Sequence, residues 1–204
     1  MHVEPVTLDG THVRLEPLSL AHHPDLATVG LDEDVVRLTQ AYPPTPEGLR
    51  TYIQTALTWQ ANGTAVPFAV IGKAAGRAVG STRYANIDKA NRRLEIGWTW
   101  YGRDFQRTAV NTETKYLLLQ HAFETLGCIR VEFKTDVLNE RSRRALLRIG
   151  AKEEGVFRRH MILADGRVRD TVYFSIIDSE WPGVKTHLAA KLARDYSSRD
   201  SDRG

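Results

Sequence analysis

The amino-acid sequence predicts a mixed α/β fold, in which helices flank one mixed sheet. Apolar residues alternate with a period of two in some segments and recur at three- and four-residue spacing in others, which are the periods of strands and helices. Short, turn-like connections join three successive strands, so these strands should form an antiparallel meander. Further along, a strand, a helix and a strand follow one another, and this order requires a crossover between two parallel neighbours.

The N-terminal part is expected to contain one strand and two helices. Val13 and Leu15 alternate with charged residues in a strand over 12–18, after which the period lengthens to that of a helix over 19–29. Thr45 and Pro46 mark the start of the second helix, because threonine caps helices well and proline fits the first turn. The apolar stripe of this helix consists of Leu49, Tyr52, Ile53, Ala56 and Leu57. Residues 32–44 are expected to form an ordinary polar loop.

The middle and C-terminal parts supply the rest of the sheet. The meander is expected over 66–71, 79–87 and 93–100, with connections at 73–77 and 88–92. A helix then begins near Asn111, a good N-cap, and stops before Gly127. The strand over 129–135 should run parallel to the strand over 93–100. A helix over 139–149 ends at Gly150, and a hairpin of strands 155–163 and 168–177, turning at 164–167, closes the fold.

Length and composition fit a single domain with a real core. A chain of 204 residues with 42% hydrophobic content can bury roughly 70% of its unfolded surface. The domain is expected to span 1–180, followed by a tail over 181–204. In this tail, Val184, Leu188, Ala189 and Leu192 have the spacing of a short helix, whereas 195–204 has no apolar stripe and is predicted to be mobile.

Charge and cysteine content exclude several classes of protein. The 28 basic and 25 acidic residues are interspersed, and the net charge is only +3, which argues against nucleic acid as a partner. One cysteine, Cys128, rules out an internal disulfide and a multi-cysteine metal site, and its position predicts an inward residue at a strand start. None of the seven histidines has metal-ligand spacing, so we expect no metal. No run approaches the ~18 apolar residues of a membrane span, and the expected compartment is the cytoplasm.

The stretch over 92–126 is the most informative part of the chain. Leu94, Ile96, Trp98 and Trp100 alternate along a strand and are predicted to share one face of the sheet, and Gly97 lets another group approach the backbone closely. The turn over 106–111 then lies at a helix N-terminus, where unpaired N–H groups and the helix dipole favour a phosphate. Arg103 and Arg107 add positive charge to this predicted anion site.

These residues resemble the GCN5-related N-acetyltransferases (GNAT), whose pyrophosphate loop reads Gln/Arg-x-x-Gly-x-Gly/Ala before a helix. Here the loop runs from Gln106 to Asn111, with Ala109 where glycine is usual, and an alanine with a positive φ would be strained. The segment over 128–151 resembles the ribosomal-protein-alanine acetyltransferase branch, through Asn139, Ser142 and Gly150-Ala151. The segment over 165–175 resembles the closing hairpin of that branch. The resemblance, over roughly residues 10–180, implies a mostly antiparallel sheet of six to seven strands with about four helices.

The resemblance also implies acetyl-CoA as co-substrate and assigns residues to it. The phosphates should bind the turn, and the pantetheine arm should pair with the backbone of the preceding strand, with Asn139 and Ser142 on its far side. The two helices before the meander should wall the acceptor site. The implied carrier-binding residues are Trp98, Thr99, Trp100, Arg103, Gln106, Arg107, Thr108, Ala109, Val110, Asn111, Thr112, Asn139 and Ser142.

The acceptor amine must lose its proton before it can attack a thioester. At about pH 7.5 this costs a lysine about 4 kcal/mol, whereas an α-amine pays only about 0.3 to 0.7 kcal/mol. A protein or peptide N-terminus is therefore the less demanding acceptor. Glu95 is the candidate base, since the resembled family often carries an acid at this Glu-Ile-Gly position. The alternative is that Glu95 only forms an ion pair with Arg93 or Arg83. Glu113, in the first turn of the helix, should complement the helix dipole.

The departing thiolate needs a proton donor, for which Ser142 and Tyr173 are the candidates. Ser142 is consistent with the resembled branch, but its place near a helix start also suits plain capping. Tyr173 is the alternative donor, or a residue that only packs on the sheet. The acceptor is left open among a peptide N-terminus, a polyamine, an amino acid and an antibiotic. A non-catalytic acyl-CoA-binding module and a basic nucleic-acid adaptor remain the alternative functions. A homodimer is also possible, because Trp181 and the closing strands could meet a second copy.

Overall fold

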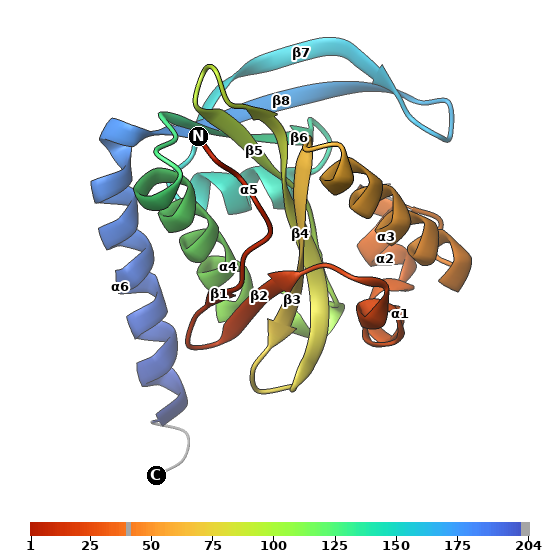
Figure 1. Cartoon of the computed structure of the whole chain (residues 1–204), viewed down its shortest axis with the longest axis horizontal. Helices are drawn as coiled ribbons and strands as arrows, with labels where there is room; N and C mark the ends of the chain where they lie inside the picture. The colour runs from red at the N-terminus through yellow and green to blue at the C-terminus, as the bar shows by residue number, and fades with distance from the viewer. Residues whose placement is uncertain (40–41, 201–204) are drawn as a thin grey trace.

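A computed structural model describes residues 1–39 and 42–200 of the chain. Within this part, eight strands form one sheet with the order β1-β2-β3-β4-β5-β6-β8-β7 (Figure 1). The strands are β1 Leu8–Asp9, β2 Val13–Pro17, β3 Ala65–Gly72, β4 Arg77–Asp88, β5 Arg93–Tyr101, β6 Arg130–Asp136, β7 Lys152–Ile162 and β8 Val168–Ile177. All neighbours pair antiparallel except β5 and β6, which are parallel as predicted. The predicted fold class is confirmed, with one short strand, β1, beyond those expected. The prediction of a polar loop over 32–44 was wrong in part, because Glu33–Thr39 forms a helix.

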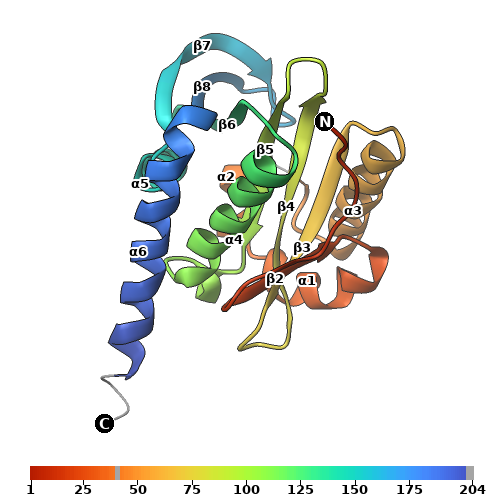
Figure 2. The ribbon, with the colours of Figure 1, turned by 60° about the vertical axis from the view of Figure 1, so that its left-hand side comes forward.

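In the described part of the chain, six α-helices cover the two faces of the sheet (Figures 1 and 2). They are α1 His23–Gly30, α2 Glu33–Thr39, α3 Pro46–Ala61, α4 Ala109–Gln120, α5 Glu140–Arg148 and α6 Trp181–Asp200, with 3-10 turns at Leu20–His22, Arg103–Phe105 and Asp178–Glu180. One hydrophobic core joins α4, α5 and α6 to the sheet, and a second core joins α1, α2 and α3 to the opposite face. The protein is therefore a three-layer sandwich.

Local sequence signals explain most helix starts. The Thr45 side chain accepts a hydrogen bond from the Gly48 amide at 3.0 Å and Pro46 opens α3, as predicted. The predicted cap of α4 was wrong, because Thr108 and not Asn111 takes the N-cap position and accepts from the Val110 amide. At its C-terminal end α4 continues into a π-helical turn over His121–Thr125 before Gly127. The helix predicted over 19–29 is divided into a 3-10 turn and α1.

The C-terminal segment differs most from expectation. The short predicted helix is the middle of α6, which reaches Asp200 and lies against α4 (Figure 2). Residues 195–200 are therefore helical, contrary to the prediction, while 201–204 lie outside the described residues. Trp181 is only 5% exposed and stacks on Phe123 with ring centroids 5.5 Å apart, so it is not the partner-facing residue that the sequence suggested.

Candidate active site

The site is organised by the only parallel strand pair among the described residues, β5 and β6. Their pairing covers Arg93 to Glu95 on β5 and Arg130 to Glu132 on β6, and β5 continues to Tyr101 without further pairing to β6. The two strands thus separate after Glu95 and Glu132. We call the region between the unpaired parts of β5 and β6 the strand gap.

A β-bulge shapes β5 beside the strand gap. Arg83 pairs with Gly97 and Ser81 pairs with Trp100, so two residues, Trp98 and Thr99, face one on β4. Trp98 has a φ of +49°, which is rare for a non-glycine residue. The bulge reverses the alternation of side chains, and the prediction of one shared face was wrong. Leu94 and Ile96 belong to the core under α4, whereas Trp98 and Trp100 join the core under α1, α2 and α3.

Buried side chains hold the bulge from the α3 side. The Tyr52 hydroxyl donates to the Trp98 carbonyl at 3.3 Å. Arg83 is 1% exposed and its guanidinium carbon lies 4.7 Å from the ring centroid of Tyr52, 5.2 Å from that of Trp59 and 5.1 Å from that of Trp98. These cation–π contacts fix the Trp98 side chain and thereby the strained backbone at the bulge.

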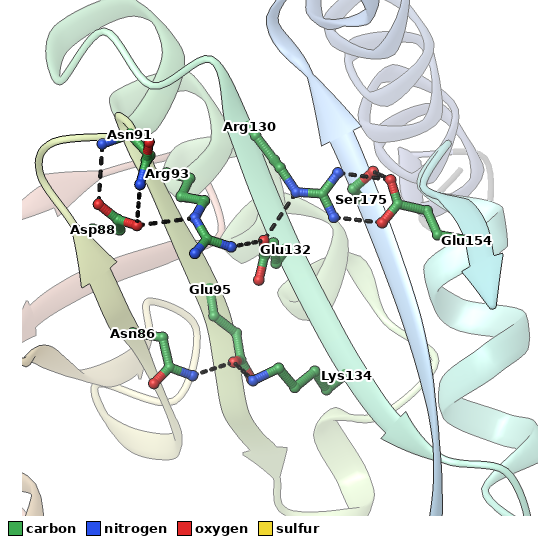
Figure 3. Close-up of polar contacts among 10 residues, drawn as sticks. All are labelled: Asn86, Asp88, Asn91, Arg93, Glu95, Arg130, Glu132, Lys134, Glu154 and Ser175. Carbon is green, nitrogen blue, oxygen red and sulfur yellow. Dashed lines mark hydrogen bonds and ion pairs between the residues drawn. The ribbon is translucent and has the colours of Figure 1, made fainter. Parts of the chain in front are cut away.

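Glu95 lies on the same side as Trp98, where the strand gap begins. Its side chain is 5% exposed and forms an ion pair with Lys134 of β6 at 2.8 Å. It also accepts a hydrogen bond from the Asn86 amide at 2.6 Å (Figure 3). A Cβ added to Gly97 would lie 2.8 Å from the Glu95 carboxylate, so the glycine makes room for this group, as the sequence suggested. The sequence left open an ion pair of Glu95 with Arg93 or Arg83, and Glu95 does form an ion pair, but with Lys134.

A second set of ion pairs joins the strands at the paired end (Figure 3). Arg93 links Asp88 on β4 to Glu132 on β6, with 2.9 Å between the Arg93 and Glu132 atoms. Arg130 contacts Glu132 and Glu154, the second on β7. Four strands are thus connected where β5 and β6 are still paired, which fixes the point from which they separate.

The turn before α4 has the features of an anion site. Its first residue, Gln106, donates to the Tyr101 carbonyl at 2.9 Å and accepts from Arg141 of α5 at 2.7 Å. Arg107 is exposed and has a φ of +59°, so the left-handed residue of the turn is Arg107 and not Ala109, which is buried and already helical. The predicted strain at Ala109 is therefore absent. Val110 is buried beside it, and Asn111 is half-buried as the third residue of α4.

Nearby arginines adjust the predicted charge of this turn. Arg103 is paired with Asp32 and Asp34, the first at 3.2 Å, so its charge is largely neutralised by the α2 region. Two arginines of α5 that sequence reasoning missed also lie at the start of α4. Arg141 contacts the turn, and Arg148 donates to the Thr112 hydroxyl at 3.0 Å. Because these arginines are far from the turn in the sequence, no local sequence pattern indicates that they lie close to it.

The remaining predicted site residues lie on α5 and β8. Asn139 caps α5 by accepting from the Ser142 amide at 3.0 Å, so the Asn-x-x-Ser pattern first of all starts a helix. Tyr173 packs on Phe157, with ring centroids 4.3 Å apart, and the Lys134 ammonium lies 5.2 Å from its ring centroid. Glu113 accepts from three backbone amides of residues 11–13 at 2.5 to 2.8 Å, so it ties α4 to β2 rather than acting only on the dipole.

One buried charged residue near the strand gap was missed entirely. Lys115 of α4 is 5% exposed and donates a hydrogen bond to the Thr99 hydroxyl at 2.9 Å. Its ammonium lies 5.6 Å from the ring centroid of Phe133 on β6. Burial lowers the pKa of Lys115 to about 7, although the charge of Glu95 acts in the opposite direction. A helical lysine carries no sequence signal for burial, since most lysines are exposed.

The described ranges contain neither a cluster that could hold a metal ion nor a helix that could cross a membrane. Across residues 1–39 and 42–200, no three histidine, cysteine or acidic side chains are grouped in a way that could hold a metal ion. In the same part of the chain, no helix combines the length and the apolar character needed to cross a membrane.

Comparisons with known proteins agree with this geometry. A family model described as an acetyltransferase (GNAT) domain matches residues 12–152, which is more than half of the chain. YdaF of Bacillus subtilis strain 168, provisionally named a ribosomal N-acetyltransferase, is 36% identical over 110 residues, which make up 54% of this chain and 59% of YdaF. The match thus spans less than two-thirds of that relative.

Solved structures extend the likeness to nearly the whole chain. An acetyltransferase of T. thermophilus, also provisionally named, has a TM-score of 0.84 at 40% identity, covering 94% of this chain and 100% of that one. Mycobacterium smegmatis RimJ, solved in complex with CoA-disulfide, shares the fold with a TM-score of 0.77 at 21% identity, covering 92% of this chain and 95% of that chain. The chain belongs to the GNAT acetyltransferase family.

Proposed function

We propose that the protein transfers the acetyl group of acetyl-CoA to a primary amine by direct attack in a ternary complex. The observation that carries this proposal is the strand gap, which opens beside the Trp98 bulge and the N-terminus of α4. Membership of the GNAT family and the CoA-containing complex of the structural neighbour RimJ support acetyl-CoA as the donor.

The phosphates of the carrier would bind at the start of α4. The helix N-terminus supplies free amides and the positive end of the dipole. Arg107 and Arg141 add the charge that a pyrophosphate requires, and Gln106 joins the turn to both β5 and α5. The pantetheine arm would then follow the backbone from Trp100 to Trp98 into the strand gap. This assignment retains the sequence prediction for Trp98, Thr99, Trp100 and the turn, but gives the role of Arg103 to Arg141.

The chemistry requires a base and a group that stabilises the oxyanion. Glu95 is buried at the start of the strand gap and would take the amine proton, directly or through water. The strained backbone at Trp98 would present an amide to the thioester carbonyl, which becomes negatively charged as the amine attacks. The nitrogen–carbon bond forms as the carbon–sulfur bond breaks, and free coenzyme A leaves.

A protein or peptide N-terminus is the proposed acceptor. An α-amine is neutral to a useful extent near neutral pH, so it demands little of a carboxylate base. The provisional name of the Bacillus subtilis relative points to the same class. Polyamines, amino acids and antibiotics are the competing acceptors, and a screen that starts with short peptides would separate them.

Calorimetric titration with acetyl-CoA tests the carrier site. We expect Arg107→Glu to weaken binding by at least about tenfold, because it loses a charge-assisted contact worth about 1.5 to 3 kcal/mol. Arg50→Glu, on the exposed side of α3, makes the same charge change elsewhere and should leave the dissociation constant within about threefold. Parallel titrations with dephospho-CoA and with ATP would show which parts of the carrier contribute to binding.

Three results would argue against the proposal in different ways. If the unmodified chain bound no acetyl-CoA, the carrier assignment would be wrong. Binding without thiol release for any amine in the screen would instead indicate the non-catalytic acyl-CoA-binding module. Equal weakening by Arg107→Glu and Arg50→Glu would place the phosphates somewhere other than the turn.

A further inference from the structure

Lys115 combines burial with the lack of a direct ion pair within the described residues, although the charge of Glu95 acts on it. Only 5% of the residue is exposed, and none of the ion pairs found in the described part of the chain involves it. Its one hydrogen-bond partner there is the Thr99 hydroxyl. An unpaired buried charge destabilises a fold, whereas an apolar side chain of similar size would not. The residue therefore needs an explanation other than stability.

The ammonium group contacts side chains of both separating strands. Thr99 belongs to the part of β5 beyond its last pairing with β6, and Phe133 is the first β6 residue after Glu132, where that pairing ends. Lys115 therefore approaches the strand gap from the α4 side. Glu95 and Lys134 approach it from the opposite face, because their neighbours Leu94, Ile96 and Phe133 are packed in the core under α4. The strand gap thus has a carboxylate on one side and an amine on the other.

We propose that Lys115 donates the proton to the departing sulfur of coenzyme A, an inference that rests on the proposed function. The acceptor nitrogen attacks the thioester carbon, the nitrogen–carbon bond forms and the carbon–sulfur bond breaks. Sulfur takes a proton from the Lys115 ammonium, and the proton lost by the amine goes to Glu95. Lys115 then regains a proton from solvent before the next turnover. The helix that holds the phosphates at its N-terminus thereby also supplies the acid.

The acidity of Lys115 suits a thiol. Burial lowers the pKa of Lys115 to about 7, and this amine gives up its proton to a thiolate far more readily than an ordinary lysine with a pKa of about 10.4. Among charged and titratable groups nearby, Glu95 on β5 opposes this shift. Tyr84 on β4 and Tyr101 on β5 share the α4 face, and burial raises the pKa of both, so they remain neutral. Lys134 on β6 is engaged by Glu95.

This assignment replaces the two donors that the sequence suggested. Ser142 lies in the first turn of α5, where its amide is capped by Asn139. Tyr173 packs against Phe157 of the closing hairpin, on the face that carries Lys134. Lys115 is the group that enters the strand gap from the helix whose start would hold the carrier.

The test compares Lys115→Met and Lys115→Arg with the unmodified protein. Methionine fills a similar volume without a charge, and arginine keeps the charge but holds its proton with a pKa above about 12. We expect kcat to fall by about 10²-fold or more in both variants, within the usual range for lost acid catalysis. The acetyl-CoA dissociation constant should stay within about threefold. Lys185→Met, which removes a surface lysine paired with Glu124, is the control and should keep kcat.

The pH profile gives a readout that a merely structural role would not change. An acid must be protonated to act, so kcat of the unmodified protein should decline as the pH rises through the pKa of Lys115, and Lys115→Arg should lack this decline. A kcat within about threefold of normal in Lys115→Met would overturn the role, as would a decline of kcat with pH in Lys115→Arg equal to that of the unmodified protein. Absence of turnover by the unmodified protein would overturn the proposed function and this role together.

Discussion

At the residue scale, the properties of each charged side chain in the candidate site depend on the few groups that contact it. Glu95 has an amide from Asn86, an ammonium from Lys134 and the space left by Gly97. The sequence predicted Glu95 and the need for Gly97, because both follow from the residues of one strand. It did not predict Lys134 or Lys115, since these come from other elements and only the register of the sheet brings them near. Contacts between distant parts of the chain carry no local pattern.

Glu95→Gln tests the base. The amide is nearly the same size, so the fold should be kept while the proton acceptor is lost. We expect kcat/KM to fall by about 10²- to 10⁴-fold. Steady-state rates across the pH range would measure this, with Glu47→Gln as the control, because it makes the same change on the exposed side of α3. An unchanged kcat/KM and pH profile in Glu95→Gln would show that another group accepts the proton.

At the element scale, irregularities decide the geometry and are the least predictable features. The strand over Arg93–Tyr101 was predicted almost to its ends, but its bulge was not, because a run of alternating residues looks the same with or without one. The start of α4 was misplaced for a similar reason. Thr108 and Asn111 are both good N-caps, and the choice between them depends on how Gln106 and Arg107 leave β5.

Glu113→Gln tests the connection between α4 and β2. The carboxylate accepts three backbone amides of residues 11–13, and a neutral amide accepts them less strongly and adds an N–H group without a place there. We expect a loss of about 1 to 3 kcal/mol in the free energy of unfolding. Urea denaturation would measure it, with Glu47→Gln on the exposed side of α3 as control. A loss no larger than that of the control would mean that the three contacts are not stabilising.

At the scale of the whole molecule, topology was the most predictable property. The antiparallel meander, the parallel crossover and the closing hairpin all follow from element order and connection length, which sequence patterns report well. The extent of α6 was not predicted, because its continuation beyond residue 192 has no apolar stripe of its own. The helix is held in place by its buried residues Trp181, Val184 and Leu188. Their burial depends on contacts with α4 and the sheet, which the local sequence does not indicate.

Lys115 should also change how the free energy of unfolding of the whole protein depends on pH. Its pKa is about 7 when folded and about 10.4 when unfolded, so between these values the unfolded chain binds a proton that the folded chain has lost. This group's contribution to the free energy of unfolding therefore rises with pH in that range and is constant below it. Below about pH 7, Lys115→Met should be more stable than the unmodified protein, by up to a few kcal/mol.

Urea denaturation of both proteins at about pH 6.5 and about pH 9.5 would measure this difference, and other titrating groups cancel in the comparison. The advantage of Lys115→Met should shrink at the higher pH. A difference that is the same at both values would mean that the folded pKa of Lys115 is not lowered.

The three amides held by Glu113 have a consequence for synthesis of the chain on the ribosome. Residues 11–13 emerge first, yet the carboxylate that satisfies them is made about a hundred residues later. β2 can pair with β3 earlier, once residue 72 has appeared. Its contact with the Glu113 carboxylate can form only after α4 has been synthesised. The N-terminal edge of the sheet is therefore completed late in translation, and nascent chains that stop before residue 113 expose it to other polypeptides.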